Sequence, residues 1–330
     1  MPAEVPPIEE LTDATAGALL PERSARGHKG TFGRLLVVAG SLDYAGSALL
    51  VCLAAGRAGA GLVALAVPES LQPLFAAKVV EATTMALPED DVEEVEPEDA
   101  LARILDHEHD ALVVGPGLRP GLATVELIRR LLSVADEGTP PAVVDAEALR
   151  SLAAHDEWWL DVHRACVLTP HTGEFARLRA ASGIAAGADG DLLADDDARA
   201  AAAVDAARRW GQVVVLKGAR TVIAAPDGRL ARAGFENPAL ASGGTGDVLS
   251  GTIGALLAQH LEPFAAARLG VFLHGTAGES IRDRLGDAGL LASDLPFEIA
   301  LARKRLAATR ARRTAERKLG FGVRPGGSQS

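Results

Sequence analysis

Short, uninterrupted apolar runs alternate with Ala- and Leu-rich segments of helical spacing over most of this chain. Strands that are apolar on both faces are typical of a parallel sheet that helices cover on both sides. The pattern therefore predicts an α/β fold with a central, mostly parallel sheet. The expected strands are residues 35–39, 62–67, 111–114, 142–145, 167–168 and 213–216. The helices expected between them are residues 46–57, 97–106, 121–135, 146–154, 173–181 and 198–210.

A different pattern follows the last of these strands. Two further apolar runs, 221–225 and 230–233, flank Pro226-Asp227-Gly228, and Asp-Gly is typical of the tight turn of a hairpin. Three closing helices are expected at 245–259, 263–284 and about 292–317. We expect one domain over residues 26–300, an irregular arm before it (1–25), and a basic helical extension after it (301–330) that ends in a disordered tail, GFGVRPGGSQS.

The composition excludes several classes of protein. With 330 residues, of which 48% are hydrophobic, the chain can bury a large core and is not disordered as a whole. Its longest uncharged stretches have about 14 residues, whereas a membrane-spanning helix needs roughly 18, and no secretory signal is visible. Two cysteines, Cys52 and Cys166, cannot build a disulfide framework and are expected to be buried, reduced thiols. Together these features predict a cytoplasmic protein.

The charge is distributed unevenly along the chain. A net charge of −11 disfavours nucleic acid as a partner. Residues 89–99 carry eight acids and no base, whereas residues 303–318 carry eight bases and one acid. We expect both segments to be solvated surface, because nothing else in the sequence supports a partner for either of them.

A glycine-rich run, NPALASGGTGDVLSG, leads directly into an apolar helix at residues 237–251. Small residues let backbone N–H groups approach an anion, and a helix N-terminus adds unpaired donors and the positive end of its dipole. Residues 243–246 are therefore a candidate phosphate cradle. Asp247 follows in the first helical turn, where two interpretations stay open: an acid that stabilises the helix dipole, or a general base beside bound phosphate. Neither a Walker A motif nor a strand–GxGxxG–helix unit is present, which disfavours a Rossmann dehydrogenase.

Several further motifs occur in order along the chain. They are HKGTFG (28–33), AGS (39–41), GSA (46–48), GPGL (115–118), DA (145–146), LTPH (168–171), GEF (173–175), KGART (217–221) and the run 237–251. Over about residues 26–300 this set resembles the ribokinase-like superfamily and, more narrowly, the ADP-dependent NAD(P)H-hydrate dehydratases of the bacterial carbohydrate-kinase-type family. The resemblance implies a three-layer αβα sandwich around the central sheet.

The resemblance also implies an activity, the repair of damaged nicotinamide cofactors. The family converts the S-epimer of NADH or NADPH hydrated at C6 (NADHX or NADPHX) back to NADH or NADPH, and uses ADP while releasing AMP and phosphate. The implied path begins like a kinase reaction, with transfer of the β-phosphoryl group of ADP to the C6 hydroxyl, and ends with elimination of phosphate. Phosphoryl transfer from ADP implies Mg²⁺, although the sequence contains no cluster of direct metal ligands.

Individual residues acquire roles from the same resemblance, with Asp247 as the catalytic base. The other implied positions are Gly243, Gly244, Thr245 and Gly246 in the anion hole; Lys217, Gly218, Ala219, Arg220, Thr221 and Gly246 around ADP or AMP; and Ser47, Gly117, His171 and Asp247 around the hydrated dinucleotide. The chain departs from the family at Ser47, where relatives often carry Ala, and at Thr172, where they commonly carry Pro. For Glu174, a water-mediated contact to magnesium and a helix cap both stay open. The pair His28-Lys29 is a weaker candidate for reaching phosphate across a subunit boundary.

The resemblance further implies a homotetramer and a functional link to a separate epimerase, because the chain has no room for the epimerase domain that is fused to some relatives. No membrane or nucleic-acid partner is expected. Two alternatives stay open: a kinase for a vitamin precursor such as hydroxyethylthiazole, and a non-catalytic nucleotide-binding protein whose partner-binding element is 303–318. The HKGTFG and KGART runs favour the dehydratase over the kinase, and retention of Asp247 argues against the non-catalytic protein.

Overall fold

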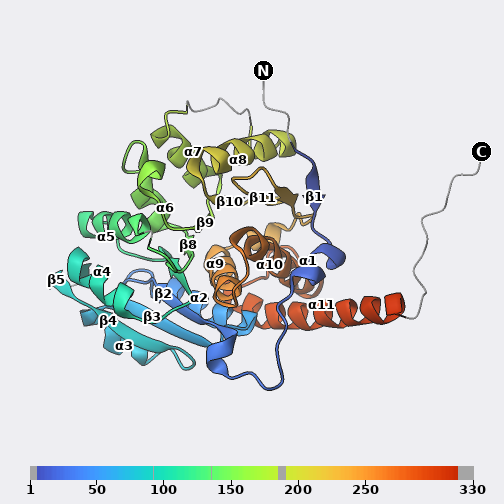
Figure 1. Cartoon of the computed structure of the whole chain (residues 1–330), viewed down its shortest axis with the longest axis horizontal. Helices are drawn as coiled ribbons and strands as arrows, with labels where there is room; N and C mark the ends of the chain where they lie inside the picture. The colour runs from blue at the N-terminus through green and yellow to red at the C-terminus, as the bar shows by residue number, and fades with distance from the viewer. Residues whose placement is uncertain (1–5, 92, 135, 185–190, 319–330) are drawn as a thin grey trace, which may run out of the picture.

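A central sheet with helices on both faces forms the body of the molecule (Figure 1). The computed structural model describes residues 6–91, 93–134, 136–184 and 191–318. One ten-stranded sheet has the strand order β1-β12-β11-β10-β9-β8-β7-β2-β3-β4, and a small second sheet pairs β5 with β6. The strands are β1 (Ile8–Glu10), β2 (Arg34–Val38), β3 (Leu62–Pro68), β4 (Thr83–Leu87), β5 (Glu89–Asp91), β6 (Glu94–Val95), β7 (Ala111–Val114), β8 (Ala142–Val144), β9 (Cys166–Leu168), β10 (Val213–Leu216), β11 (Val222–Ala224) and β12 (Leu230–Arg232).

The strand directions confirm the mostly parallel sheet that the sequence predicts. From β10 through β9, β8, β7, β2 and β3 to β4, every neighbouring pair is parallel. The hairpin expected around Asp227-Gly228 is also confirmed, because β11 and β12 are antiparallel and flank this turn. β11 is antiparallel to β10 as well, so the change of direction is confined to one end of the sheet.

Two groups of helices cover the two faces, which confirms the three-layer sandwich. Successive side chains of a strand point to opposite faces, so Leu35 and Val37 of β2 join the core with α1, α2, α9, α10 and α11, and Leu36 and Val38 join the core with α4 to α8. The helices are α1 (Asp13–Leu19), α2 (Ala45–Ala58), α3 (Gln72–Ala76), α4 (Pro97–Asp106), α5 (Leu122–Ser133), α6 (Glu147–Leu152), α7 (Thr172–Ala181), α8 (Asp196–Trp210), α9 (Thr245–Ala258), α10 (Pro263–Leu285) and α11 (Leu295–Lys318).

The N-terminal segment is not the irregular arm that the sequence predicts. β1 pairs with β12 at the edge of the sheet, and α1 begins with a capping box between Thr12 and Thr15. Leu11 and Ala16 are buried in the core. Elements of three and seven residues carry too little periodicity to be recognised from sequence, and β1 depends on a partner more than 200 residues away along the chain.

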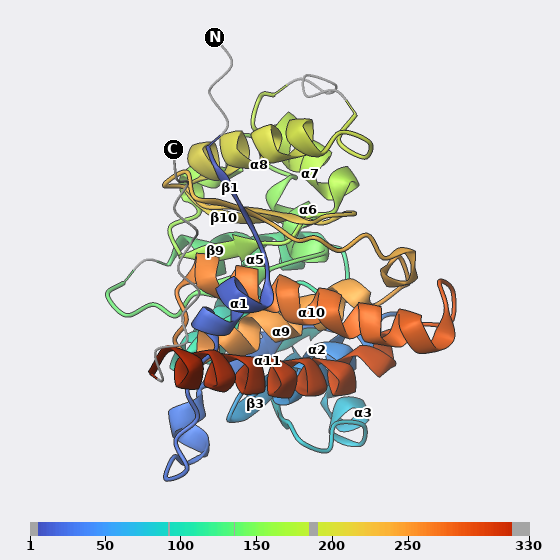
Figure 2. The same ribbon diagram turned by 90° about the vertical axis from the view of Figure 1, so that its right-hand side faces the viewer.

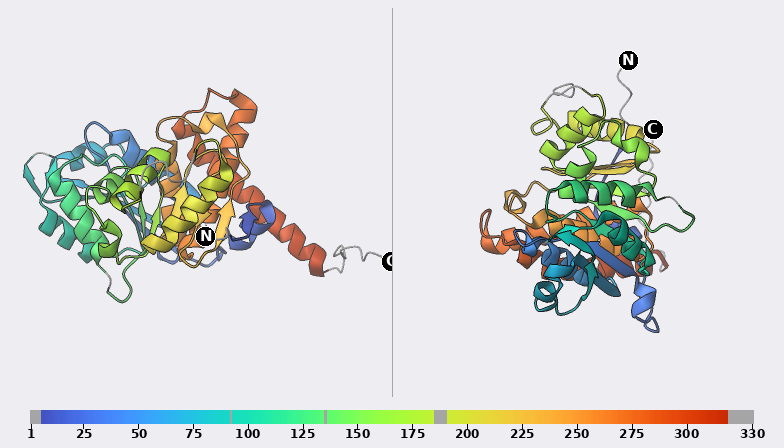
Figure 3. Two further views of the ribbon diagram at one scale, coloured as in Figure 1. Left: turned by 90° about the horizontal axis from the view of Figure 1, so that it is seen from above. Right: turned by 90° about the vertical axis from the view of Figure 1, so that its left-hand side faces the viewer.

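At the other terminus, α11 extends the fold beyond residue 300. Ala302 and Leu306 are buried in the same core as α2 and α10, while the far end of the helix projects from the body (Figure 3). Elements outside the expected domain 26–300 thus contribute to its core at both ends. The expected disordered tail, GFGVRPGGSQS, lies outside the described residues.

Short elements between β3 and α4 also escape the sequence analysis. α3 and β4 follow β3, and β4 extends the sheet by pairing parallel with it. The acidic segment 89–99 contains β5, β6 and the first turn of α4, where Glu96 accepts a hydrogen bond from the backbone of Asp99. Strands of two or three residues show no usable alternation of polar and apolar side chains.

The two cysteines agree with their expected state. Cys52 in α2 and Cys166 in β9 are both buried and free, and burial raises the pKa of each thiol to about 12. Among the described residues, no helix combines the length and the hydropathy that a membrane span requires.

Candidate active site

The order of the strands creates a switch point between β2 and β7. The chain runs outward from β2 through β3 to β4, and then returns to the other side of β2 with β7 and continues through β8, β9 and β10. The loops at the carboxyl ends of β2 and β7 therefore diverge, which is where ligands bind in open α/β sheets. They are held together by hydrogen bonds from Gly40 N–H to the Pro116 carbonyl (2.9 Å) and from Gly115 N–H to the Val38 carbonyl (3.1 Å).

The N-terminus of α9 faces this crevice with free backbone donors. Gly244 is the N-cap of the helix. Among the described residues, no hydrogen-bond acceptor is found for the backbone N–H groups of Gly243, Gly244, Gly246 and Asp247. Unpaired donors at a helix N-terminus attract anions. Of the predicted cradle, residues 243–246, the three glycines thus have free donors, and the adjacent N–H of Asp247 is free as well.

Thr245 stabilises this turn, because its own N–H and hydroxyl donors bond to carbonyl groups within the turn. Its hydroxyl donates to the carbonyls of Leu240 (2.8 Å) and Ser242 (2.9 Å), and its N–H donates to Ser242. Its own carbonyl accepts a hydrogen bond from Nε2 of His274 at 3.0 Å. Burial lowers the pKa of His274 to about 4, so the ring is neutral at pH 7 and can donate only from that nitrogen.

Close packing of α2 against α9 brings further predicted residues together. A Cβ on Gly251 would lie 2.3 Å from the Val51 carbonyl oxygen, so only glycine permits this approach. The contact places the N-termini of α2 and α9 side by side, and the Ser47 hydroxyl lies close enough to the Asp247 carboxylate to lower its pKa. Gly117, with φ +67°, lies against the same end of α2, where a Cβ would be 2.8 Å from that of Ser47. Ser47, Gly117 and Asp247 therefore form one group.

Lys217 lies at the centre of a buried charge network. Its Nζ is 3.0 Å from Oδ1 of Asp145 and 3.9 Å from Oε2 of Glu174, while Ser250 donates to the other Asp145 oxygen at 2.7 Å. Burial lowers the pKa of Lys217, but the two carboxylates outweigh it and the pKa lies above its usual value. Lys217 is therefore a permanent cation. A Cβ on Gly246 would lie 3.5 Å from its Nζ, so the cation is adjacent to the cradle.

Asp247 occupies an unusual environment for a carboxyl group. Its pKa is raised to about 6, mainly by burial and also by the charge of Asp145, while the nearby Ser47 hydroxyl and Lys217 oppose the shift. A carboxyl group with this pKa is ionised at pH 7 and still basic enough to accept a proton. The position supports the general-base interpretation of Asp247, and its place in the first turn of α9 is equally compatible with a favourable helix-dipole interaction.

His171 and Glu174 cap the N-terminus of α7, which lies next to Lys217. Nδ1 of His171 accepts hydrogen bonds from the N–H groups of Gly173 (3.0 Å) and Glu174 (3.3 Å), and Glu174 accepts one from the His171 N–H. Of the two interpretations left open for Glu174, the helix cap is therefore present. The His171 side chain is 57% exposed, and its Nε2 lies 3.5 Å from Oε1 of Glu174.

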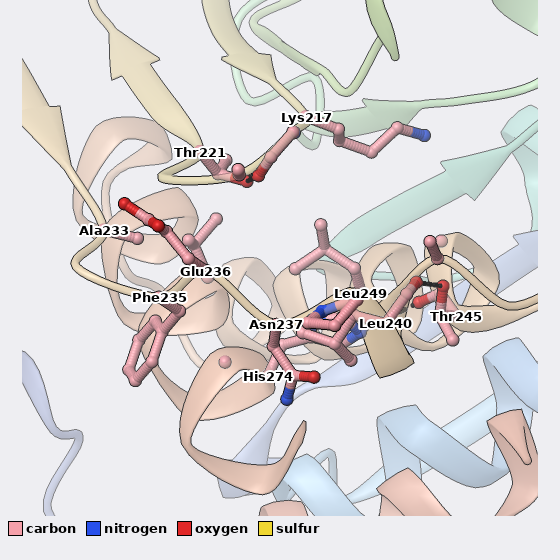
Figure 4. Close-up of a pocket in the computed structure, with 17 residues that line it drawn as sticks. Lys217, Thr221, Ala233, Phe235, Glu236, Asn237, Leu240, Thr245, Leu249 and His274 are labelled. Carbon is pink, nitrogen blue, oxygen red and sulfur yellow. Dashed lines mark hydrogen bonds between the residues drawn. The ribbon is translucent and has the colours of Figure 1, made fainter. Parts of the chain in front are cut away.

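A cavity of about 450 Å³ adjoins the cradle (Figure 4). Lys217 and Thr221 lie on one side and Leu240, Leu249 and His274 lie on the other, and Gly218, Ala219 and Gly246 also line it. Its remaining walls are mostly apolar. This combination of apolar walls and few polar groups is typical of a small-molecule site.

Arg220 is the one member of the KGART run that does not line this cavity. Its side chain forms ion pairs with Glu10 of β1 (3.6 Å) and Asp196 of α8 (3.4 Å). The structure thus groups Lys217, Gly218, Ala219 and Thr221 with the cradle and directs the arginine away from it. The pair His28-Lys29 also lies elsewhere: the segment 29–33 packs at the C-terminal end of α9, where a Cβ on Gly33 would overlap the Ala258 carbonyl.

Three residues of the site were not assigned from sequence. Asp145 and Asn237 belong to motifs of the sequence, but the sequence gives neither of them a role. His274 lies in α10, and no motif around it indicates a functional residue. Asn237 lines the cavity, and its buried Nδ2 has no acceptor among the described residues. An unpaired donor in an apolar cavity can recognise a ligand acceptor such as a ring nitrogen.

The carboxylates around Lys217 fit magnesium only in part. No group of three His, Cys, Asp or Glu residues among those described could hold a metal ion by itself. Mg²⁺ commonly binds through one or two carboxylates together with substrate phosphates and water. Asp145 and Glu174, both beside Lys217, are suitable for that mode.

Comparisons with known proteins agree with this geometry. A model of the family described as NAD(P)H-hydrate dehydratase matches residues 35–300. A "Bifunctional NAD(P)H-hydrate repair enzyme Nnr" of Moorella thermoacetica is 43% identical over 86% of this chain, which spans about half (52%) of that relative's length. An "ADP-dependent (S)-NAD(P)H-hydrate dehydratase" of Xanthomonas campestris is 34% identical over 89% of this chain and 96% of its own. An "ADP/ATP-dependent NAD(P)H-hydrate dehydratase" from Bacillus subtilis, crystallised with ATP/Mg2+, is similar with a TM-score of 0.74 and 33% identity over 91% of this chain and 99% of that one.

Proposed function

Because the chain belongs to the NAD(P)H-hydrate dehydratase family and has a ribokinase-like fold, we propose that it restores hydrated NADH and NADPH by an ADP-dependent dehydration. The substrate is the S-epimer of NADHX or NADPHX, and the products are NADH or NADPH, AMP and phosphate. The name of the similar Xanthomonas campestris dehydratase specifies ADP as the co-substrate and the S-epimer as the substrate. The vitamin-precursor kinase considered from sequence would share the cradle and its base, but the family match favours the dehydratase.

One observation carries the proposal: a carboxylate with a raised pKa lies beside a turn of unpaired N–H groups and a buried cation. Asp247 provides the carboxylate, residues 243–246 provide the turn and Lys217 provides the cation. A phosphoryl group bound at such a turn is activated by hydrogen bonds and positive charge. A hydroxyl group beside Asp247 loses its proton to the carboxylate as it attacks.

The first step joins the C6 oxygen of the hydrate to the β-phosphorus of ADP. Asp247 accepts the hydroxyl proton, the bond from the β-phosphorus to the bridging oxygen breaks, and AMP leaves with that oxygen. The N–H groups of the cradle and Lys217 stabilise the charge that spreads over the transferring phosphoryl group. No group on the protein changes its oxidation state.

The second step breaks the C6–O bond. Phosphate leaves with the oxygen while the ring nitrogen supplies electrons to C6, and loss of a proton from C5 restores the dihydropyridine ring. Phosphate is a far better leaving group than hydroxide, which is why a phosphoryl donor is consumed in a dehydration. We infer that Ser47 and Gly117, which lie close to Asp247, bind the dinucleotide, and that His171 contributes to the same binding.

The cavity next to the cradle is the proposed site of the nucleotide donor. Its apolar walls suit the base, and the unpaired Nδ2 of Asn237 is available to an acceptor on it. Bound with the phosphates, Mg²⁺ would neutralise charge there, held by Asp145 and Glu174 directly or through water.

Three further features belong to this proposal. A homotetramer and a functional link to an epimerase that interconverts the hydrate epimers are inferred from the family resemblance. A cytoplasmic location is in keeping with two buried, unpaired thiols. Neither nucleic acid nor a membrane is proposed as a partner.

Absorbance at 340 nm tests the function directly. Purified protein with Mg²⁺, ADP and NADHX should produce a rise that is matched by equal amounts of AMP and phosphate. A parallel reaction with ATP separates the donors, because a rise with ATP alone would contradict the proposed use of ADP. If folded protein gives no rise with either nucleotide, the dehydratase proposal is wrong and an acceptor screen for a kinase becomes the next step.

A further inference from the structure

A second cavity of about 450 Å³ lies at the opposite end of α2 from Ser47. It is bounded by the segment Leu20 to Arg23 after α1, by the C-terminal end of α2, and by one side of α11. Figure 2 shows α1 beside α11. α2 has 14 residues, which corresponds to about 20 Å of helix, and so the cavity is well separated from the cradle of α9. None of its lining residues lines the cavity next to Lys217.

Five basic residues line this second cavity, and no acidic residue lines it. They are Arg23, Arg57, Arg303, Lys304 and Arg310, and we call them the basic cluster. They come from three segments that are far apart in sequence. Elsewhere in the described chain, arginines commonly pair with carboxylates, as Arg229 does with Asp227 and Glu262. No member of the basic cluster has a carboxylate within ion-pair distance among the described residues.

Hydrogen bonds explain part of this arrangement but not its charge. Arg303 donates to the Ala58 carbonyl (2.5 Å) and to Gln259 (2.9 Å), Arg23 donates to the Gly59 carbonyl (2.8 Å), and Arg310 donates to the Leu20 carbonyl (2.6 Å). Cations near a helix C-terminus are favourable, yet the end of a helix carries only about half of a negative charge. These neutral acceptors leave the cluster without a carboxylate within ion-pair distance among the described residues.

The guanidinium groups are also crowded. A Cβ on Gly59 would lie 3.1 Å from Nη1 of Arg23 and 3.2 Å from Nη1 of Arg303, so both groups approach the same point. The pKa of Arg303 is lowered to about 10, mainly by burial and also by the charges of Arg23 and Arg310. Like charges in such proximity repel one another unless an anion lies between them.

We propose that the basic cluster binds a small anion that carries two or more phosphate groups, at a site distinct from the candidate active site. The volume is sufficient for a diphosphate or a nucleotide-sized molecule, and guanidinium groups match phosphate oxygens in charge and geometry. The ligand would join the segment after α1 to α2 and α11. The proposal does not depend on the dehydratase function, because it uses none of the residues around Asp247.

Calorimetric titration with inorganic pyrophosphate at low ionic strength tests the site. The titration uses the full chain carrying Lys217→Met, which removes the cation of the candidate active site and leaves the basic cluster intact. We expect one equivalent of pyrophosphate to bind, with an affinity that falls as salt is added. Absence of binding at low salt would overturn the proposal, and so would binding of an RNA oligonucleotide without binding of pyrophosphate.

Substitutions locate the bound anion. The variant Arg57→Gln/Lys304→Gln removes two exposed charges. Arg57 lies over the Phe297 ring, 5.5 Å from its centroid, so urea denaturation is used to confirm that the variant keeps its stability. Its pyrophosphate affinity should fall about tenfold or more. The matched control is Arg305→Gln/Arg312→Gln, which removes two charges of α11 that do not line the cavity, and its affinity should stay within about twofold. Equal losses in the two variants would show a diffuse charge effect and contradict a defined site.

Discussion

The cations near the two ends of α2 differ in their partners. At its N-terminal end, the nearby cation, Lys217, is half-buried and paired with the buried carboxylates of Asp145 and Glu174. At its C-terminal end, five basic side chains surround a cavity. Among the described residues, the three of them that form hydrogen bonds, Arg23, Arg303 and Arg310, donate only to neutral groups. The first end also has the unpaired N–H groups of α9 next to it, which the second end lacks.

This difference suits the N-terminal end of α2 to catalysis and its C-terminal end to ligand binding. Paired, buried charges keep their positions without a ligand, and such preorganisation is what stabilises developing charge in a transition state. Unpaired charges gain their counter-ion only when a ligand arrives, so their main effect is on affinity and stability. Changes at the N-terminal end of α2 should therefore alter turnover, and changes at its C-terminal end should not.

The largest effect is expected for Asp247→Asn. An amide cannot accept the hydroxyl proton, so turnover should fall by about 10²- to 10⁴-fold, while ADP affinity measured by calorimetry stays similar. The 340 nm assay measures the loss. Asp283→Asn, an exposed acid of α10, serves as the control and should be fully active. Near-normal turnover in folded Asp247→Asn would remove this residue as the base.

Gly246→Val should have the next largest effect, on binding of the donor. Its side chain would lie beside Nζ of Lys217, since even a Cβ would be 3.5 Å from that atom, and it would occupy the space of the anion. Loss of hydrogen bonds to a charged phosphate corresponds to about 10- to 100-fold weaker ADP binding. The control is Ala154→Val, at an exposed position after α6 that lines neither cavity. Unchanged ADP affinity in folded Gly246→Val would contradict the placement of the phosphate.

The pH dependence of kcat/KM should show the raised pKa of Asp247. The base must be ionised, so activity should be constant above the pKa of about 6 and fall about tenfold per pH unit below it. Ser47→Ala removes a hydrogen bond that lowers this pKa, and the acid limb should therefore move to higher pH. An acid limb that stays in place, or moves to lower pH, would mean that Ser47 does not stabilise the ionised base.

The smallest effect is expected on the free energy of unfolding, when a single hydroxyl group is removed from α9 or from α11. Ser250→Ala leaves one oxygen of buried Asp145 without its donor, which should lower the free energy of unfolding by about 1.5–3 kcal/mol. Thr309→Ala in α11 removes an exposed hydroxyl that bonds only to the Arg305 carbonyl of its own helix, and it should cost less than about 0.5 kcal/mol. Urea denaturation measures both values, and equal costs would contradict the distinction between the two ends.

Much of the fold could be predicted from the sequence because local signals are strong. The apolar runs, the Asp-Gly turn and the long helices lie within a few residues of their expected positions. β1, β4 and α3 could not be predicted, because they are short and depend on partners elsewhere in the sheet or core. Periodicity detects an element only when it is long enough to repeat.

The same division applies to the candidate site. The cradle and Asp247 are contiguous in sequence and could be proposed from it, whereas the pairing of Lys217 with Asp145 joins residues 72 positions apart. The direction of Arg220 depends on Glu10 and Asp196, which come from distant elements. His274 donates a hydrogen bond to the carbonyl of Thr245, and no local sequence motif predicts this contact. The basic cluster likewise exists only after three separate segments have folded together.

The central claim is that the N-terminus of α9 directs phosphoryl transfer to the substrate hydroxyl before dehydration. Oxygen labelling tests it most directly. NADHX prepared with ¹⁸O in its C6 hydroxyl is converted with ADP in unlabelled water, and the released phosphate is analysed by mass spectrometry. Transfer to the hydroxyl predicts one ¹⁸O atom in each phosphate. Unlabelled phosphate accompanied by ¹⁸O in the solvent would show that the hydroxyl leaves as water without being phosphorylated, and would contradict the account.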